Sequence, residues 1–537
     1  MRDLRRMNGP WSAVRAQVAG ARERYLGLLS SARRCQEAVL GRILARNAGS
    51  TYGLRYRFGA IRRARQYQQA VPLTRYEELE ADIEEIASRG RDTLTSDPVI
   101  AFERTGGSRG GSKLIPYTRA SIEGFRSALL PWLDDLLLSY PGIAEGGAYW
   151  AVSPVARQHE RTPSGIRIGL DSDSEYFGAS LAQAVSETLV LPPAIAKIGD
   201  LDAWRFITLA SLLAREELSF ISIWSPSFLG ELLRPLSEAR AAAEVLEGIR
   251  SGSFSRHEDA ARAAGLPRLD PSPKRALSLE EALGRQEWTL KSLWPRLSVL
   301  SCWTHASSKV FLPRMAKRVE GINVQGKGLV ATEAIVSLPL ASMPYPVLAV
   351  ESAFYEFLDA DGRALLCDEL SVGECYSIVI TTLGGLYRYR IGDLVSVRGY
   401  QGEAPLLEFT GREGQTVDLV GEKLREDFVV EAIKPLVHGF WMLAPVMDVS
   451  PHYRLIAEER GADEALAAAA DRALCTNPQY AYARSLGQLG PLRVSRCPDL
   501  AHRWLMRAAR DGRRIGDVKP PVLAGPGDLD FLRGALR

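Results

Sequence analysis

Apolar residues recur every three or four positions through the first fifty residues of the chain, which is the period of an amphipathic helix. The run stops at residues 47–50, where asparagine, glycine and serine are typical helix terminators. We therefore predict a helix that packs on the main body of the protein. The alternative is an arginine-rich transit peptide, although Asp3, Glu23 and Glu37 interrupt the basic residues. The periodic positions are Val14, Val18, Ala21, Tyr25, Leu28, Ala32, Val39 and Ile43.

Beyond residue 50 the pattern alternates between amphipathic helical segments and short β-branched runs. Residues 252–278 are polar and contain glycine, proline and serine, which predicts a surface excursion inside a domain. Strands that alternate with helices indicate an α/β architecture of at least two layers. Helices are predicted over residues 76–88 and 121–139, and strands over residues 147–152, 220–224, 347–351 and 376–381.

The pattern changes after residue 412. A chain of 537 residues exceeds a single compact core, so more than one domain is expected. We predict a large α/β domain over residues 1–412 and a small α+β domain over residues 413–537. The small domain is predicted to contain strands over residues 441–449, 453–458 and 492–494 and helices over residues 463–474 and 499–510.

Composition narrows the class of protein. Hydrophobic residues make up 46% and charged residues 24% of the chain, which excludes a disordered or fibrous protein. A net charge of +3 provides no electrostatic footprint for nucleic acid, and no apolar run approaches the ~20 residues of a membrane span. The six cysteines are scattered without a CxxC pair, which indicates reduced thiols in a cytoplasmic protein.

A glycine-rich segment over residues 102–113, FERTGGSRGGSK, carries the first chemical signal. Its glycines let backbone N–H groups turn toward a polyphosphate, and Lys113 adds a positive charge. A Walker loop is excluded because no Gly-Lys-Ser/Thr ends the segment. A nucleophile elbow at residues 106–110 remains open, although Pro116 stands where its helix would run. A flexible loop without a ligand also remains open.

Short motifs in a fixed order surround this loop and extend over residues 51–523. Through them the chain resembles the Gretchen Hagen family of acyl acid amido synthetases, in its bacterial form, within the adenylate-forming enzymes. The resemblance implies a large adenylate-forming N-terminal domain and a small mobile C-terminal domain that rotates between half-reactions. The motifs include TYG at 51–53, VPL at 71–73, LWP at 293–295, ATE at 331–333, YEF at 355–357, GLYRYRIGD at 385–393, GEK at 421–423 and VKPP at 518–521.

The function that this resemblance implies is ATP-dependent activation of a carboxylic acid as an acyl-adenylate. Transfer to an amine, expected to be an amino acid, would then give an amide, AMP and pyrophosphate. The expected cofactors are ATP and Mg²⁺, and no nucleic acid or membrane is expected as a partner. One alternative transfers the acyl group to a thiol or a hydroxyl. Another is a non-catalytic binding protein with a degraded phosphate loop, because family members more often carry a lysine where Gly111 stands.

The resemblance also assigns residues to the parts of the nucleotide. It gives the ribose hydroxyls to Asp393, with Tyr387 stacked near the nucleotide. From the residues alone, Asp393 could instead cap a turn or pair with Arg388 or Arg390, and Tyr387 could be a packing residue. The phosphates are assigned to Thr105, Gly106, Gly107, Ser108 and Lys113.

Five further residues complete the expected site. Thr332 and Glu333 match the element beside adenine and the metal, where Glu333 would meet Mg²⁺ that arrives with ATP; a strand-end charge is the alternative. Lys423 is expected to contact phosphate, and Lys519 to be the mobile catalytic lysine delivered by domain rotation. Simple solvation is the alternative for both lysines. Arg412 stands at the expected hinge between the domains.

The acyl pocket is expected to draw on three segments, residues 121–132, 149–152 and 220–228. Their aromatic content suits an aryl or long apolar acid. Neither the acid nor the amine can be named from these residues, because apolar pockets separate close analogues weakly.

Overall fold

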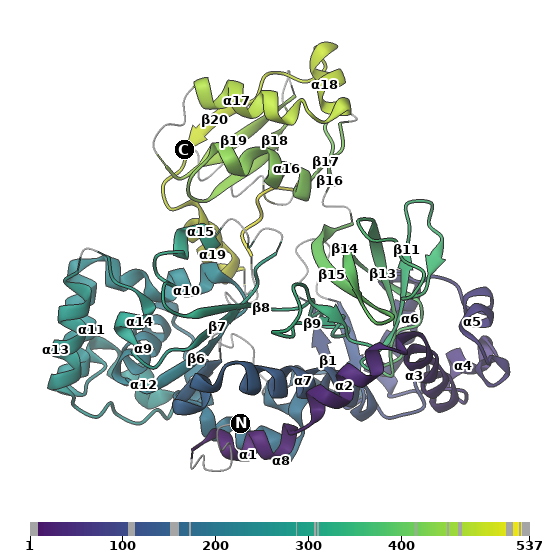
Figure 1. The fold of residues 1–537 in the computed structure, drawn as a ribbon, viewed down its shortest axis with the longest axis horizontal. Coiled ribbons are helices and arrows are strands. Elements are labelled where there is room, and N and C mark those ends of the chain that lie inside the picture. The colour runs from purple at the N-terminus through teal and green to yellow at the C-terminus, as the bar shows by residue number, and fades with distance from the viewer. Residues whose placement is uncertain are drawn as a thin grey trace.

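The computed structural model describes residues 9–105, 113–150, 160–170, 173–285, 287–305, 308, 311–413, 416–420, 422–447, 451–459, 464–511, 519–525 and 528. Figure 1 shows three lobes: one built on a parallel sheet, one on an antiparallel sheet, and a smaller C-terminal lobe above them. The expected α/β architecture with a smaller α+β unit at the C-terminal end is confirmed. None of the helices within the described ranges combines the length and apolar character needed to cross a membrane.

The periodic N-terminal segment forms three helices instead of the one that we predicted. They are α1 (Trp11–Val18), α2 (Ala21–Leu29) and α3 (Ala32–Arg46). Gly20 separates the first two with a φ of 76°, a left-handed conformation that glycine adopts without strain. The segment packs on the protein as expected, and the Gln36 side chain donates to the carbonyl oxygens of Val350 and Ala353 at 2.7 and 2.8 Å.

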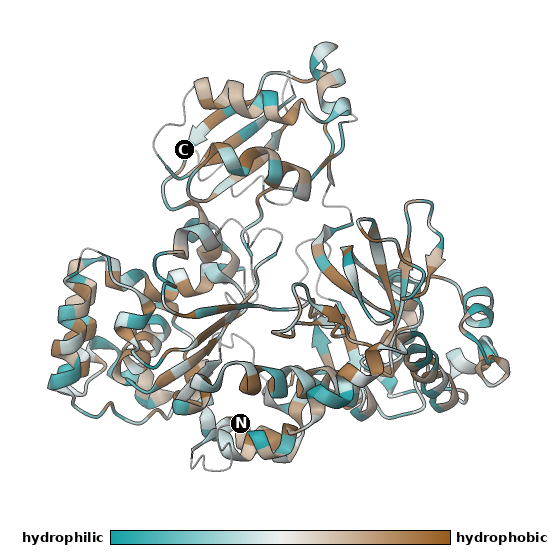
Figure 2. Cartoon of the chain, viewed as in Figure 1, coloured by the Kyte–Doolittle hydropathy of each residue, from teal (hydrophilic) through white to brown (hydrophobic). Residues whose placement is uncertain are grey.

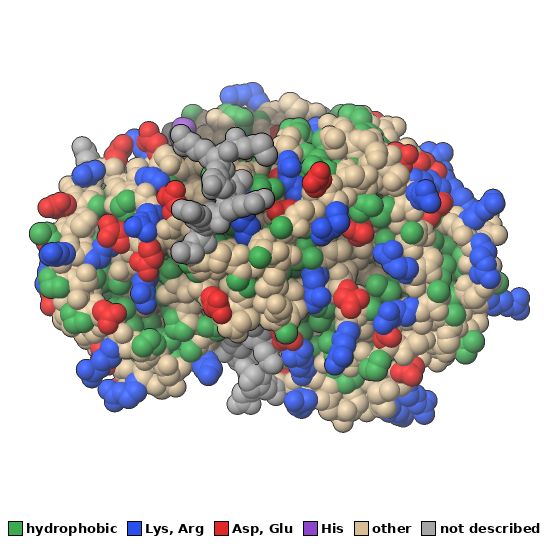
Figure 3. Space-filling view, turned by 60° about the horizontal axis from the view of Figure 1, so that its bottom comes forward, with side chains coloured by type: hydrophobic (Ala, Val, Ile, Leu, Met, Phe, Trp, Pro, Cys, Tyr) green, Lys and Arg blue, Asp and Glu red, His purple; other side chains and the backbone are tan. Residues whose placement is uncertain are grey.

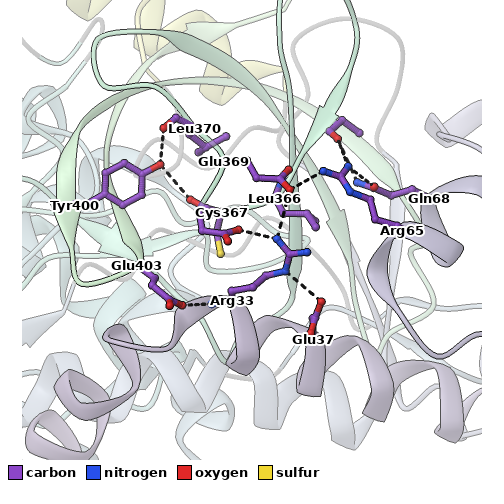
Figure 4. Close-up of polar contacts among 12 residues, drawn as sticks. Arg33, Glu37, Arg65, Gln68, Leu366, Cys367, Glu369, Leu370, Tyr400 and Glu403 are labelled. Atoms are coloured by element: carbon purple, nitrogen blue, oxygen red, sulfur yellow. Dashed lines mark hydrogen bonds and ion pairs between the residues drawn. The ribbon is translucent and has the colours of Figure 1, made fainter.

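Ion pairs also join two helices of the N-terminal part of the chain to a loop of the antiparallel sheet (Figure 4). Arg33 on α3 pairs with Asp368 at 2.8 Å, and Arg65 on α5 (Ala64–Ala70) pairs with Glu369 at 2.6 Å. Because exposed ion pairs contribute little energy individually, their main effect here is to set the position of the helices against the loops.

Two further helices confirm the expected pattern. Helix α6 (Tyr76–Arg89) begins at the predicted residue, and α7 (Arg119–Ser139) begins two residues before it. Thr118 caps α7, because its side-chain oxygen accepts a hydrogen bond from the backbone N–H of Ser121 at 3.1 Å. The short α4 (Thr51–Arg55) follows α3.

Four parallel strands form the first large sheet, in the order β3-β6-β7-β8. Parallel strands bring their carboxyl ends to one edge, where ligands of open α/β sheets bind. The strands are β3 (Gly147–Trp150), β6 (Leu218–Ser222), β7 (Val299–Cys302) and β8 (Asn323–Gly326). The helices of this lobe include α8 (Ala179–Thr188), α9 (Leu201–Ala214), α10 (Pro226–Leu233), α11 (Ala239–Ser251), α14 (Leu290–Leu293) and α15 (Leu312–Met315).

The predicted surface excursion at residues 252–278 is wrong in part. It contains α12 (Glu258–Ala263) and the beginning of α13 (Pro273–Leu283), whose Ala276 is buried in the core. Pro273 stands at the first turn of α13, where its missing N–H costs nothing. Arg275 is buried as well and donates to the carbonyl oxygen of Leu213 at 2.9 Å. A buried charged side chain that donates to carbonyl oxygens gives no apolar signal, which explains the error.

The antiparallel sheet contains seven strands in the order β12-β11-β13-β14-β15-β10-β9. Its central feature is the long pair β14–β15, in which Asp393 lies opposite Arg412. Strand β10 is shorter than predicted. The strands are β9 (Ser337–Leu338), β10 (Val347–Leu348), β11 (Phe354–Leu358), β12 (Ala364–Leu365), β13 (Cys375–Thr381), β14 (Tyr389–Gln401) and β15 (Ala404–Arg412). A smaller sheet contains β1 (Ala101–Arg104), β2 (Leu114–Tyr117), β4 (Glu160–Arg161) and β5 (Arg167–Ile168).

The C-terminal lobe is built on a three-stranded sheet in the order β18-β19-β20. Apolar residues concentrate in β18 and β19, while the helices beside them carry polar faces (Figure 2). Both α16 and α18 were missing from our predictions. The elements are β16 (Thr416–Val417), β17 (Leu424–Arg425), α16 (Glu426–Ile433), β18 (Trp441–Val446), β19 (His452–Ala457), α17 (Glu464–Leu474), α18 (Pro478–Ser485), β20 (Arg493–Arg496) and α19 (Leu500–Arg510).

Charged side chains of both signs are interspersed over the face drawn in Figure 3. This distribution agrees with the small net charge of +3. That face therefore offers no extended surface of a single sign for a polyanion.

Candidate functional site

The candidate site is centred on an ion pair at the end of the β14–β15 ladder, between a buried carboxylate and a half-exposed guanidinium. Asp393 is only 2% exposed, and Arg412 Nε donates to its Oδ1 at 2.6 Å. Asp393 therefore pairs with an arginine, as one alternative expected, but the partner is Arg412 and neither Arg388 nor Arg390. Arg388 pairs with Glu356 instead, and Arg390 with Glu413, each at 2.9 Å.

Arg412 contributes its side chain to the site in addition to its expected place at a hinge. It is the last residue of β15, so the strand ladder fixes its backbone opposite Asp393. The charge of Asp393 raises the pKa of the Arg412 guanidinium, and Glu333 acts in the same direction. Arg412 consequently carries a permanent positive charge beside two carboxylates.

Glu333 lies within the same group of charges. Burial raises the pKa of its carboxyl above the usual value, while the positive charges of Arg412 and Lys113 oppose that rise. The preceding residue is held firmly, because Tyr117 Oη donates to the Thr332 carbonyl oxygen at 2.5 Å. Since Tyr117 is on β2, this bond joins the Thr332–Glu333 segment to the hairpin that carries the glycine-rich loop.

That hairpin brings the two ends of the loop together. The Thr105 N–H donates to the Lys113 carbonyl oxygen at 3.0 Å, and Lys113 Nζ lies 3.9 Å from Glu77. Gly106, Gly107 and Ser108 lie outside the described residues, and so does the unusual Gly111. The flanking strands β1 and β2 are antiparallel. A nucleophile elbow needs a helix directly after its serine, so this hairpin contradicts the elbow.

Lys519 reaches the site from the C-terminal lobe. Its Nζ lies 3.6 Å from the ring centroid of Trp303 and 5.7 Å from that of Phe409. Burial and, to a smaller extent, the charge of Arg412 lower the pKa of Lys519 to about 8, whereas Asp393 and Glu426 oppose the shift. A lysine with such a pKa gains or loses its proton close to neutral pH, which is typical of lysines at functional sites.

The segment that carries Lys519 is anchored to the small lobe by strand-like pairing. The Leu443 N–H on β18 donates to the Val522 carbonyl oxygen at 2.7 Å. The Ala524 N–H donates back to Leu443 at 2.8 Å. The backbone that carries Lys519 is therefore part of the C-terminal lobe, while its ammonium lies among residues of the two large lobes.

Lys423 has a different environment from Lys519. It is exposed, and it lies just before β17 with a φ of 47°. The neighbouring Glu422 is buried and accepts hydrogen bonds from the backbone N–H groups of Leu419 and Val420 at 2.7 and 2.9 Å. Glu422 thus stabilises the turn, and Lys423 lies outside the group of charges formed by Glu333, Asp393 and Arg412.

Tyr387 is a packing residue, which corrects the expectation that it stacks near the nucleotide. Its ring stacks on Tyr52 with centroids 4.7 Å apart, and Phe58 meets it edge-on at 4.9 Å. Its hydroxyl donates to the Leu94 carbonyl oxygen at 2.5 Å. The side chain is fully buried, so both faces and the polar end are already occupied by protein.

Several residues at the carboxyl edge of the parallel sheet were not anticipated. Trp303 follows β7, and Lys327 follows β8 directly. Trp224, two residues past β6, was within an expected acyl segment, and its ring lies 5.4 Å from that of Trp303. The signal that could have found them is their position, since residues just beyond parallel strands meet at one edge.

Candidate metal ligands are few in the part of the chain that the structure describes. Those residues contain no group of three or more histidine, cysteine, aspartate or glutamate side chains placed to hold a metal ion. Glu333 and Asp393 act on one another electrostatically, so the site offers a pair of carboxylates. Such a pair suits a hard cation that also has phosphate oxygens as ligands.

Comparison with known proteins agrees with this geometry. The fold is similar to the acyl acid amido synthetase AtGH3.15 in complex with 2,4-DB, with a TM-score of 0.84, 20% identity and 97% of each chain covered. It is also similar to 2-hydroxyisobutyryl-CoA ligase in its postadenylation state, with a TM-score of 0.52, 14% identity, and 93% and 91% of the two chains covered. The adenylate-forming fold expected from the sequence is thereby confirmed.

Three domains of one family match consecutive parts of the chain. The GH3 family N-terminal domain matches residues 21–324, the central domain residues 346–412 and the C-terminal domain residues 427–526. The chain therefore belongs to the GH3 family. A similar relative is the probable indole-3-acetic acid-amido synthetase GH3.7 of Oryza sativa subsp. japonica, which is 26% identical over 78% of this chain and 75% of its own. Because this relative is a plant protein, it adds no support for a bacterial origin.

Proposed function

We propose that the protein is an ATP-dependent acyl acid amido synthetase. It activates a carboxylic acid as an acyl-adenylate and transfers the acyl group to an amine, which we take to be an amino acid. The observation that carries this proposal is the position of Lys519, delivered by the small lobe to the Asp393–Arg412 pair. Membership of the GH3 family and the names of its relatives support the same activity.

In the first half-reaction, a carboxylate oxygen of the acid attacks the α-phosphorus of ATP and pyrophosphate leaves. Negative charge accumulates on the phosphate oxygens in the transition state, and preformed positive groups stabilise it. We assign this role to the Lys519 ammonium and, at the base of the glycine-rich loop, to Lys113. The loop itself, with Thr105, Gly106, Gly107 and Ser108, is proposed to supply hydrogen-bond donors.

Asp393 is proposed to bind the ribose hydroxyls. Arg412 Nε donates to one of its carboxylate oxygens at 2.6 Å, which orients the carboxylate. An ionised carboxylate accepts hydrogen bonds from two hydroxyls and donates none. Arg412 is thus a positioning residue in this proposal, and Thr332 and Glu333 line the adenine side.

Mg²⁺ is proposed to arrive with ATP, and its charge would offset that of the phosphates. Glu333, with its carboxylate near Asp393 and Lys113, is the side chain that we assign to it. Phosphate oxygens and water would complete its ligands, as is usual when Mg²⁺ accompanies a nucleotide.

In the second half-reaction, the amine attacks the carbonyl carbon of the acyl-adenylate. A C–N bond forms, the C–O bond to AMP breaks, and the nitrogen loses a proton. We propose that residues 413–537 rotate between the two half-reactions, with Arg412 as the hinge. In this proposal the rotation brings Lys423 into contact with phosphate. Small molecules in the cytoplasm are the proposed partners; all six cysteines are free thiols, as expected there.

The test is acid-dependent exchange of labelled pyrophosphate into ATP, screened over a panel of aryl and aliphatic acids. We expect at least one acid to support exchange, and we expect Asp393→Ala to abolish it. AMP release is then measured with amino acids, coenzyme A and simple alcohols as acceptors. Release that requires a thiol or an alcohol would replace the amide assignment. ATP binding without exchange for any acid would favour a non-catalytic binding protein.

A further inference from the structure

The Lys519 ammonium contacts aromatic rings of both large lobes. Its Nζ lies 3.6 Å from the ring centroid of Trp303, which follows β7, and 5.7 Å from that of Phe409 on β15. A cation within about 6 Å of a ring centroid is attracted to the face of the ring, and an indole attracts it most strongly. These two contacts join a residue of the C-terminal lobe to one residue of each large lobe (Figure 1).

The charged groups around Lys519 are bonded elsewhere. Asp393 and Glu426 attract the ammonium through space, while Arg412 repels it. Asp393 accepts a hydrogen bond from Arg412 at 2.6 Å, and Glu426 accepts one from the Val522 N–H at 3.3 Å. Among the residues that the structure describes, none forms an ion pair with Lys519. The aromatic rings are therefore the close contacts that fix the position of its ammonium.

Trp303 is itself fixed at the edge of the parallel sheet. It directly follows β7, and its backbone N–H donates to the Trp224 carbonyl oxygen at 2.8 Å. The rings of these two tryptophans pack with their centroids 5.4 Å apart. The backbone of Lys519, in contrast, is anchored to β18 of the small lobe through Val522. The orientation of the small lobe therefore decides whether the ammonium meets the Trp303 ring.

We propose that Trp303 is a positioning residue for Lys519: its ring attracts the ammonium and thereby favours the orientation of the small lobe that serves adenylation. The inference rests on the proposed function, in which Lys519 acts at the α-phosphate in the first half-reaction. A ring attracts the ammonium without cancelling its charge, whereas a carboxylate at the same place would offset that charge. Rotation of the small lobe separates the ammonium from the ring. Phe409, whose ring is farther away, contributes less.

The rates of the two half-reactions test this role. Leucine in Trp303→Leu keeps an apolar side chain and removes the ring face, so kcat for pyrophosphate exchange should fall by about tenfold. Trp303→Phe should recover part of that rate, and Phe409→Leu should cost less than Trp303→Leu. Transfer from preformed acyl-adenylate should fall much less than exchange. A loss of the same size in both half-reactions, or a loss confined to KM for the acid, would overturn the proposal.

The alkaline limb of the exchange profile gives a second readout. Since the ring favours the charged form of Lys519, Trp303→Leu should move that limb to lower pH by about half a unit. An unmoved limb would contradict the contact. Trp288→Leu is the matched control, because it removes a buried indole of the same lobe whose ring lies 3.5 Å from Arg318 Cζ. The control should lower the melting temperature and leave both the limb and the ratio of the half-reaction rates unchanged.

Acetylation by trace acetic anhydride tests the contact without turnover. Only the neutral amine reacts, and mass spectrometry compares Lys519 with Lys317, an exposed lysine that pairs with Glu287. Near neutral pH we expect the ratio of Lys519 to Lys317 acetylation to rise by about threefold in Trp303→Leu, and by less in Trp303→Phe. If no acid supports exchange, the activity proposal fails, while this ratio still decides whether Trp303 holds Lys519. A ratio equal to that of wild type in Trp303→Leu would refute the inference.

Discussion

Lys519 shows how tertiary position sets the chemistry of one side chain. Its pKa is lowered to about 8 by burial and by Arg412, so the ammonium is present below that pH and is lost as the pH rises through it. We expect kcat/KM for pyrophosphate exchange to fall above about pH 8. Lys519→Arg should remain active to higher pH, because a guanidinium stays protonated. An identical alkaline fall in both proteins would assign that titration to another group.

Tyr387 provides a prediction that concerns the stability of the fold and leaves ATP binding unchanged. Removal of its hydroxyl by Tyr387→Phe leaves the Leu94 carbonyl oxygen without that donor, at a cost of about 1 kcal/mol. Thermal unfolding should therefore begin at a lower temperature, while KM for ATP stays at its wild-type value. Tyr67→Phe is a matched control, since the Tyr67 hydroxyl is also buried and bonds to Thr381 at 2.9 Å. A KM for ATP that rises in Tyr387→Phe but not in Tyr67→Phe would instead support a contact between Tyr387 and the nucleotide.

At the scale of elements, α19 docks the small lobe on the parallel-sheet lobe (Figure 1). His502 on α19 bonds through Nδ1 to Glu231 on α10 at 2.6 Å, and Arg205 on α9 contacts the Met506 sulfur at 3.9 Å. These contacts hold the orientation in which Lys519 reaches Asp393. The helix therefore links a contact between the lobes to the position of Lys519.

Glu231→Gln should weaken this docking and slow adenylation several-fold. Transfer from preformed acyl-adenylate should be unaffected, because that step does not need Lys519 at the α-phosphate in our proposal. Both half-reactions are measured on this variant and on Glu280→Gln, which removes the partner of Arg250 on an exposed helix surface. Equal losses in both half-reactions would mean that Glu231 acts on the stability of the fold.

At the scale of the whole molecule, the proposed rotation depends on the chain near Arg412. Arg412→Pro would remove a backbone N–H from the β14–β15 ladder, restrict φ and delete the ion pair to Asp393. Arg412→Gln deletes the ion pair alone and is the matched control. We expect the proline variant to slow one half-reaction more than the glutamine variant does. If both variants lose the same activity in each half-reaction, the hinge does not lie at Arg412.

Much of the fold follows from short-range pattern. Helix α6 and strand β13 lie where apolar periodicity predicted them, because a period of three to four or of two residues is set by neighbours along the chain. The single N-terminal helix was wrong because the apolar period continues across Gly20 and across Ser30–Ser31, where the backbone turns. Arg275 led to the opposite error, because its charged side chain gives no apolar signal although it is buried and donates to carbonyl oxygens.

The sequence by itself determined the alternation of helices and strands, the family and the residues proposed for the site, because periodicity and motif order are properties of the chain alone. Tertiary structure decided which of those residues act together. It gave Asp393 the partner Arg412, placed Tyr387 in the core, and brought the Lys519 ammonium onto the ring of Trp303. Ion pairing and burial depend on segments that are distant in sequence, so only the packed lobes could decide them.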